Sequence, residues 1–437
     1  MSMAMNNQTT STRPASRIRT MPSQTGPMTA SASAVASTAA ASKSETTKLA
    51  KRQMILDYLY THKKGSRQDI ALAVPCSLPI IAQNLAVLED EGLIQRTGFL
   101  TSTGGRKPQN YAFIPEARIA VGVSVFSDGM DLCAADLDGR RLAFTHVRLA
   151  YENSARFYDA ACNKIEDFIN ALAGREREAL AEQAQTDGGD VAAVPFDAHR
   201  VLGVAFSVQG RVSPDGEQIT FGGILGNTGL SVAPFAARLP YPCQFIHDSY
   251  SAASTEVWFD PTVSDAYCLY LNEHVGSAVI VDGRVRQGTD LRSGNCEHMR
   301  LVPGGRACYC GQRGCVDAYC SREALLGESG TDLDEFFDRL HAGDETCVRL
   351  FNDYLDALAQ TITNMRMVFS VDVILGGEIA RRFSEADMRR LAERVRALDP
   401  FPESTVQLRK SVDEAEQSTL GAALHYIRRF VDANTGR

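Results

Sequence analysis

The sequence contains no apolar run that approaches the roughly 20 residues needed to span a membrane. It begins with a segment rich in Ser, Thr and Ala, which has scattered Arg residues but no apolar core typical of a signal peptide. Its 11 cysteines are an odd number and most stand alone, so a framework of disulfides is not expected. These absences argue against membrane and secreted proteins and predict a cytoplasmic one.

Charge is distributed unevenly along the 437 residues, whose net charge is -8. Residues 1–115 hold 13 Lys and Arg against 6 Asp and Glu, a balance of +7. The rest of the chain holds 32 against 47, a balance of -15. A basic beginning and an acidic body favour an anionic partner for the N-terminal part. The length predicts more than one domain, since single cores stop growing at roughly 250 to 300 residues.

Four potential metal ligands are concentrated in the segment EHMRLVPGGRACYCGQRGCVDAYCS. They are His298, Cys308, Cys310 and Cys315. Zn²⁺ takes four nitrogen and sulfur ligands of this kind in a tetrahedron, and the glycines of C-x-C-G-x-x-G-C allow the tight turns that the spacing requires. The alternative is a loop of free thiols, but one His and three Cys in so short a segment favour a zinc site.

The first part of the chain is expected to contain a tail followed by a small domain. Residues 1–44 are mostly Ser, Thr, Ala and Met, and predict a disordered tail. Residues 45–114 predict three helices and a hairpin. The first helix turns four apolar residues toward one face: Leu49, Ile55, Leu56 and Leu59. The third helix, SLPIIAQNLAVLEDEG, is expected to be capped by Ser77, and the strands LIQRTGF and NYAFI flank the basic turn LTSTGGRKPQ.

Three helices and a basic hairpin are the elements of a winged helix-turn-helix, a fold that binds double-stranded DNA. Its third helix would lie in the major groove, where Gln and Asn side chains can read adenine. The residues expected to face DNA on this helix are Ser77, Ala82, Gln83 and Asn84. Arg106 and Lys107 follow two glycines at the tip of the hairpin, from which they can reach phosphates. A dimerisation or scaffold module is the alternative, but element order, basic wing and charge asymmetry together favour binding to an operator.

Residues 115–437 alternate between strand-like and helix-like segments in two halves. This pattern predicts a two-lobed α/β body divided near residue 245, with a ligand cleft between the lobes.

The spacing H-x9-C-x-C-G-x-x-G-C resembles the signature of the ROK family, which contains bacterial repressors, open reading frames and sugar kinases. The turn STGGRKP is similar to the wing of ROK repressors, and the resemblance runs from about residue 50 to the end of the chain. It implies an actin-like, ribonuclease H-like sugar-kinase body with a zinc loop. It also implies a homodimer or homotetramer that binds an operator and a sugar or sugar derivative.

The same resemblance implies a loss of kinase activity, because both phosphate loops are altered. The family's D-x-G-G-T is matched by residues 124–128, SVFSD, which lack the carboxylate and both glycines, and Asp128 adds a negative charge. The family's G-T-G-x-G is matched by residues 272–276, NEHVG, in which Glu273 would repel a phosphate. We therefore expect no catalytic residues and no enzyme activity.

The sugar side of the family's site is better kept. Asp248 matches the catalytic base of N-D-A-N, and His298 matches the histidine that both ligates zinc and contacts a sugar hydroxyl. Asn295 replaces the Glu of G-E-x-G-H, Asp317 replaces a Glu after the last Cys, and Asn227 matches a sugar-contacting Asn. A glutamate has moved to position 297, which we rank below these residues. The changes imply a different ligand or none.

Together these features predict a repressor of carbohydrate metabolism with a catalytically degenerate sugar-sensing body. Two alternatives remain open. One is an ATP-dependent sugar kinase that carries a DNA-binding domain, and the other is a regulator controlled by a protein partner.

Overall fold

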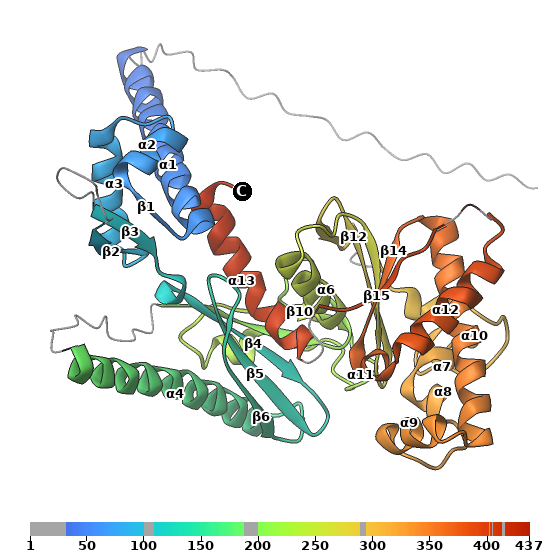
Figure 1. Ribbon diagram of the computed structural model, residues 1–437. Coiled ribbons are helices and arrows are strands. Elements are labelled where there is room, and N and C mark those ends of the chain that lie inside the picture. The colour runs from blue at the N-terminus through green and yellow to red at the C-terminus, as the bar shows by residue number, and fades with distance from the viewer. Residues whose placement is uncertain are drawn as a thin grey trace, which may run out of the picture. The chain divides into compact units, whose positions relative to one another are not determined.

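The computed structural model describes residues 32–99, 109–187, 200–288, 294–401, 403, 405–412 and 416–437, whose helices and strands are drawn in Figure 1. Residues 1–51 and 52–437 form two compact units. All contacts reported below lie within the second unit.

The chain begins with three helices and a small sheet, as the sequence predicts. The elements are α1 (Ala32–His62), β1 (Lys64–Ser66), α2 (Arg67–Ala73), α3 (Leu78–Asp90), β2 (Ile94–Phe99) and β3 (Gln109–Phe113). Residues 1–31 of the expected tail lie outside the described residues, whereas residues 32–44 belong to α1. This part of the tail is rich in alanine, which has the highest helix propensity. Of the apolar residues expected to face inward, Ile55, Leu56 and Leu59 are buried but Leu49 is 52% exposed.

Helix α3 buries Ile81, Leu85 and Leu88, which recur at the helical spacing expected for one inward face. Ser77 occupies the N-cap position with extended backbone, but its side chain makes no capping hydrogen bond, unlike the expectation. Ser66 does cap α2, in a capping box with Asp69. The sheet order is β1-β3-β2, so the hairpin gains a third strand that the sequence did not indicate.

The body contains two five-stranded sheets. The first has the order β10-β7-β4-β5-β6. Its strands are β4 (Ile119–Val125), β5 (Gly129–Asp136), β6 (Arg141–Arg148), β7 (Val201–Val208) and β10 (Cys243–His247). Strand β7 pairs in parallel with both β4 and β10, so the carboxyl ends of these three strands share one edge. The accompanying elements are η1 (Pro115–Ala117), α4 (Ala155–Asp187), β8 (Arg211–Val212), β9 (Ile219–Phe221) and α5 (Ala233–Ala236).

The second sheet has the order β13-β12-β11-β14-β15. Its strands are β11 (Ala266–Leu271), β12 (Val275–Val281), β13 (Arg284–Arg286), β14 (Asp372–Gly376) and β15 (Leu408–Lys410). Its helices are η3 (Cys296–His298), α7 (Asp317–Cys320), α8 (Arg322–Leu326), α9 (Leu333–His341), α10 (Glu345–Val368), α11 (Gly377–Arg382) and α12 (Glu385–Leu398). A large apolar core joins this sheet to α9, α10 and α12, which Figure 1 shows in orange and red.

Two further helices, α6 (Asp248–Phe259) and α13 (Gln417–Thr435), complete the body. The first sheet ends at His247, close to the expected division near residue 245. However, α13 packs on the first sheet, because a Cβ added at Gly122 of β4 would lie 1.8 Å from the Thr419 carbonyl oxygen. The last helix therefore packs on the sheet formed by the first half of the body. A single division of the sequence near residue 245 did not predict this arrangement.

Within the described ranges, no single helix is long and apolar enough to cross a membrane, and only the pair α2 and α3, bent by 115°, would pass by length and composition together.

Candidate functional site

A cavity of about 430 Å³ is lined by residues from both five-stranded sheets. The first sheet contributes the carboxyl ends of β4, β7 and β10, which is where open α/β sheets bind ligands. The second contributes Tyr270 and the start of β12, and the segment after β13 adds Asn295, Glu297 and His298. This volume falls within the range of pockets that hold small molecules.

Asp248 lies in the cavity wall as the first residue of α6, directly after β10. Its Oδ1 accepts hydrogen bonds from the backbone N–H of Ser249 at 2.6 Å and from the Ser249 hydroxyl at 3.2 Å. The Nδ1 atom of His247 lies 3.4 Å away. The side chain remains 30% exposed, so this oriented carboxylate still has room to accept a bond from a ligand hydroxyl.

Glu297 provides a second carboxylate in the cavity wall and is only 6% exposed. Its two oxygens accept hydrogen bonds from the Ser277 hydroxyl at 2.7 Å and from Nδ2 of Asn295 at 2.9 Å. Asn295 lines the cavity as expected, but its amide also positions Glu297. Glu297 was expected to matter less for ligand binding than Asn295, whereas in the structure the two side chains are hydrogen-bonded to each other in the cavity wall.

Asp317 and Asn227 are not among the residues that line the cavity. Asp317 is 4% exposed, and its oxygens accept from the backbone N–H of Val275 at 2.8 Å and contact Nδ1 of His274 at 3.3 Å. This hydrogen bond raises the pKa of His274. Asn227 is 2% exposed and lies beneath Gly222, where an added Cβ would meet its Oδ1 at 1.8 Å. Contact of either residue with a ligand stays a prediction.

On the side of the cavity that corresponds to the family's phosphate loops, polar side chains are paired with one another. The Ser124 hydroxyl lies 2.7 Å from that of Thr419, where the family resemblance places a carboxylate. Phe126 and Glu273 line the cavity, whereas Asp128 does not. Arg322 forms ion pairs with Glu378 at 3.0 Å and with Glu273 at 3.4 Å. A phosphate entering here would meet two carboxylates and a guanidinium group that they already neutralise.

The four expected metal ligands come together in the loop before α7. Their ligand atoms all lie within 4.8 Å of one another. Cys308 Sγ is 3.8 Å from His298 Nδ1, and Cys310 Sγ is 3.8 Å from Cys315 Sγ. With Zn–S bonds of about 2.3 Å, ligand atoms at the corners of a tetrahedron lie roughly 3.8 Å apart. The residues therefore fit a tetrahedral metal ion.

Local backbone and burial suit this loop to a cation. Gly314 has φ +79°, and a Cβ there would lie 1.8 Å from the Val302 carbonyl oxygen, so only glycine allows the turn into Cys315. Burial raises the pKa of the Cys308 thiol to about 12. A bound cation would offset the buried negative charge of the thiolate, and metal binding would release its proton.

Tyr309, between the first two cysteines, is a cavity residue that the sequence analysis did not identify. Its hydroxyl lies 3.3 Å from Nε2 of His298, and its ring lies 4.4 Å from that of His274. The loop that carries the four candidate metal ligands, residues 298–315, therefore places an aromatic ring in the cavity wall. Only the position of Tyr309 between two candidate ligands could have indicated this from the sequence, because a residue between two ligands of one ion must stay close to that ion.

The residues expected to bind DNA lie on or near α3 where the structure describes them. Ser77 and Gln83 are exposed, and Ala82 and Asn84 are partly exposed. Asn84 Nδ2 donates to the Ile80 carbonyl oxygen at 2.9 Å, within the same helix. Arg106 and Lys107 lie outside the described residues.

Comparison with known proteins identifies transcription regulators among the relatives of this chain. The chain is 20% identical over 332 residues to the xylose repressor of Bacillus spizizenii, covering 74% of this chain and 80% of the relative. It is 25% identical over 257 residues to the DNA-binding transcriptional dual regulator NagC of Escherichia coli, covering 57% of this chain and 56% of that protein.

Solved structures show the same fold. A ROK family transcriptional regulator, a homologue of the E. coli Mlc protein, aligns with a TM-score of 0.67 at 17% identity, covering 88% of this chain and 97% of that one. The ROK hexokinase of Thermus thermophilus aligns with a TM-score of 0.54 at 24% identity, covering 72% and 99%. The ROK family model matches residues 191–429, which is more than half of the sequence. The chain belongs to the ROK family.

Proposed function

We propose that the chain is a transcriptional regulator of carbohydrate metabolism, acting as a repressor, that senses a sugar without phosphorylating it. The observation that carries the proposal is the asymmetry of the cavity. Asp248 and Glu297 present oriented carboxylates to a ligand, while on the phosphate side Arg322 is paired with Glu378 and the Ser124 hydroxyl with that of Thr419. The names of the xylose repressor and of NagC support a role in sugar-dependent transcription.

The rival function is that of an ATP-dependent sugar kinase, since ROK kinases share the fold. When the chain is incubated with ATP, Mg²⁺ and a panel of hexoses, pentoses and N-acetylhexosamines, we expect no sugar phosphate above the uncatalysed background. Ser124 stands at the position of the family's carboxylate and cannot replace its charge, and Glu273 would repel the phosphates. Mass spectrometry of the sugars measures this, with a ROK sugar kinase as positive control. Turnover near the usual enzymatic rate of about 10 s⁻¹ would establish the rival function.

We further propose that residues 45–114 form a winged helix-turn-helix that binds operator DNA. Support comes from the order of α1, α2, α3 and the strands β2 and β3, and from the basic charge of this part of the sequence. The Ser77 hydroxyl makes no cap bond, so it can contact a phosphate at the N-terminus of α3. Arg106 and Lys107 are proposed to contact the backbone of the duplex.

Substitution Gln83→Ala is expected to reduce sequence discrimination by about 1 to 3 kcal/mol at one base pair, because it removes an exposed amide from the groove-facing side of α3. The measurement is fluorescence anisotropy with duplexes that differ at single positions of a site selected by the protein. The matched control is Gln68→Ala, an exposed glutamine on α2, which should leave base preference unchanged. Equal discrimination in both variants would remove Gln83 from the proposed contacts.

The metal in this proposal is Zn²⁺ with a structural role, bound by His298, Cys308, Cys310 and Cys315. Its chemistry would be to fix the loop that carries Tyr309 and precedes α7, which orients the cavity wall. The proposal also includes a homodimer or homotetramer, since a symmetric operator calls for paired recognition helices. A cytoplasmic location fits the lack of disulfides among the described cysteines.

Control by a protein partner remains the second alternative. A thermal-shift panel of sugars distinguishes it, because a ligand that binds only the folded state raises the melting temperature. Stabilisation by at least one sugar supports the sensor, and stabilisation by none would favour the partner.

A further inference from the structure

Two helices run from the cavity toward the N-terminal segment, which we define as residues 52–113. Helix α6 begins at Asp248 and α13 begins at Gln417, and both of these residues line the cavity. The helices pack backbone to backbone, since a Cβ added at Gly421 of α13 would lie 1.8 Å from the Ser251 carbonyl oxygen of α6. A contact this close leaves neither helix free to shift without the other.

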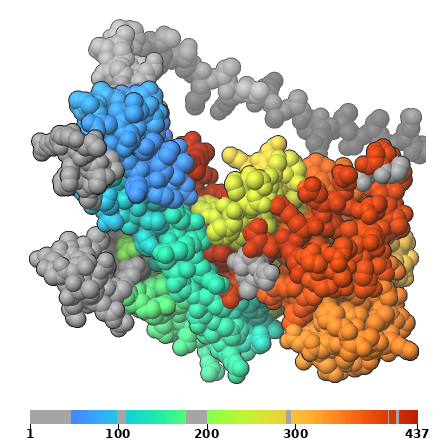
Figure 2. Space-filling model, in the orientation of Figure 1, coloured from blue at the N-terminus to red at the C-terminus, as the bar shows by residue number. Residues whose placement is uncertain are grey.

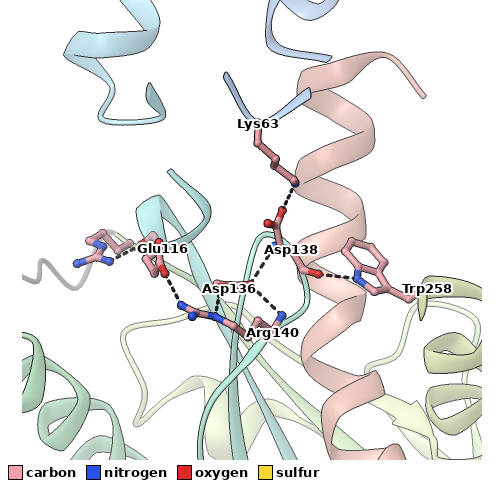
Figure 3. A network of polar contacts seen from close by, with 7 residues as sticks. Lys63, Glu116, Asp136, Asp138, Arg140 and Trp258 are labelled. Atoms are coloured by element: carbon pink, nitrogen blue, oxygen red, sulfur yellow. Dashed lines mark hydrogen bonds and ion pairs between the residues drawn. The ribbon is translucent and has the colours of Figure 1, made fainter. Parts of the chain in front are cut away.

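The far end of α6 is fixed to the turn between β5 and β6. Trp258 Nε1 donates a hydrogen bond to the Asp138 carbonyl oxygen at 2.9 Å, as Figure 3 shows. Gly139 has φ +78°, and a Cβ there would lie 2.2 Å from Trp258 Nε1, so the indole rests directly on the turn. The guanidinium group of Arg428, from α13, lies 5.7 Å from the centre of the indole ring. Arg428 of α13 therefore contacts a tryptophan near the end of α6.

The same turn holds the N-terminal segment from its other side. The Asp138 carboxylate accepts a hydrogen bond from Lys63 Nζ at 2.6 Å, and the Tyr60 hydroxyl donates to the Leu137 carbonyl oxygen at 3.3 Å. The turn itself is fixed by Asp136, which is 1% exposed and accepts from the backbone N–H groups of Asp138 at 3.0 Å and Arg140 at 2.9 Å. The turn therefore contacts Trp258 on one side and Lys63 and Tyr60 on the other.

Helix α13 reaches the N-terminal segment directly. Arg437 Nε donates to Asp57 Oδ1 at 2.6 Å, and Gln53 Nε2 donates to the Ala433 carbonyl oxygen at 2.8 Å. In Figure 2 the red atoms of the chain's end lie beside the blue atoms of the N-terminal segment. Helix α13 thus starts at the cavity and the chain at its far end contacts this segment directly, whereas α6 reaches the segment through the turn between β5 and β6.

We propose that the α6–α13 pair transmits occupancy of the cavity to the DNA-binding segment, with Trp258 and Lys63 as the positioning residues at the junction. This inference rests on the proposed function and adds the route by which the sugar would act. A ligand that contacts Asp248 would shift the pair only if it binds one arrangement of the helices more tightly than another. Contacts between neighbouring elements do not by themselves show that a signal passes between them. The test therefore measures how far a bound sugar changes the affinity for DNA.

The test uses a DNA duplex that the protein has enriched from a random pool. The dissociation constant of the chain for this duplex is measured with and without saturating sugar. D-xylose and N-acetyl-D-glucosamine are the probes. The variants are Trp258→Phe, which removes the N–H donor but keeps a ring, and Lys63→Met, which removes the charge but keeps the stem. Arg349→Ala is the control, because it breaks an exposed ion pair with Glu328 that is remote from the junction.

We expect the ratio of the two dissociation constants to fall at least threefold toward one in Trp258→Phe and in Lys63→Met, and to stay as in the wild type in Arg349→Ala. Sugar affinity by calorimetry and duplex affinity without sugar should remain within twofold of the wild type in all three. Ratios unchanged in both junction variants would overturn the proposal, even when the sugar-sensing function itself holds.

A second measurement needs no sugar. Trp258 is the sole tryptophan of the chain, so its emission reports the junction alone. We expect its emission to shift when the selected duplex binds, and Lys63→Met to abolish the shift while the duplex still binds. No shift in the wild type would overturn the route. If neither sugar alters duplex affinity in the wild type, the sugar-sensing function fails, and the emission result alone decides the route.

Discussion

Substitution Cys315→Ala is expected to abolish stoichiometric zinc binding and to destabilise the body by roughly 3 to 5 kcal/mol. Cys315 is fully buried, and its Sγ lies 3.8 Å from that of Cys310 in a group of four ligand atoms. Three remaining ligands cannot close a tetrahedral structural site, and the buried thiols then lose the cation that offsets their charge. The measurement is zinc per chain by elemental mass spectrometry, together with the midpoint of urea unfolding.

Cys320→Ala provides the matched control. Cys320 is also fully buried and lies five positions further along the chain, but it is outside the group of four ligands. We expect this variant to keep one zinc per chain and to lose about 1 kcal/mol, as is usual for a small core substitution. Stoichiometric zinc in Cys315→Ala, or no zinc in wild-type protein purified with zinc supplied, would contradict the proposed site.

The second large effect is expected at the sugar side of the cavity. Asp248→Asn should weaken binding of the sugar by about 10- to 150-fold, because a hydrogen bond to a charged group contributes roughly 1.5 to 3 kcal/mol. The Asp248 carboxylate is already held by Ser249, so the substitution removes charge without removing the side chain that fills the space. Calorimetric titration with the sugar that gives the largest thermal shift measures the change.

Glu378→Gln is the control for Asp248→Asn. Glu378 lines the same cavity but pairs with Arg322 on the phosphate side. Its substitution should leave sugar affinity within about twofold of the wild type, since a neutral sugar would not approach this ion pair. Equal losses of sugar affinity in Asp248→Asn and Glu378→Gln would show that the sugar does not bind preferentially on the Asp248 side of the cavity. That result would contradict the asymmetry on which the proposed function rests.

The metal loop was the part of the site that the sequence could specify best. Four potential ligands lie within eighteen positions and are separated by glycines, so the loop can readily bring their side chains together. The structure does bring all four together. The α/β body was predicted for a similar reason, because alternation of strand and helix patterns is a local property. Its family resemblance is confirmed by the match over residues 191–429.

The sequence could not rank the cavity residues, because ranking depends on contacts between distant segments. Asp317 was expected to contact the ligand, which stays a prediction, and in the structure it accepts the backbone N–H of Val275, 42 residues earlier in the chain. Glu297 was ranked low, yet Ser277 and Asn295 orient it in the cavity wall. Helix α13 lies on the first sheet although it ends the chain, because Gly122 and Gly421 allow close backbone approach on both of its sides.

The proposed function is tested most directly by the ratio of the chain's dissociation constants for a scrambled duplex and for the duplex that it selects from a random pool, at 150 mM salt. A sequence-specific regulator is predicted to give a ratio of about 10³ or more. A ratio near one at the same salt concentration would mean that the N-terminal segment holds DNA by charge alone, and it would contradict the assignment of this chain as a transcriptional regulator.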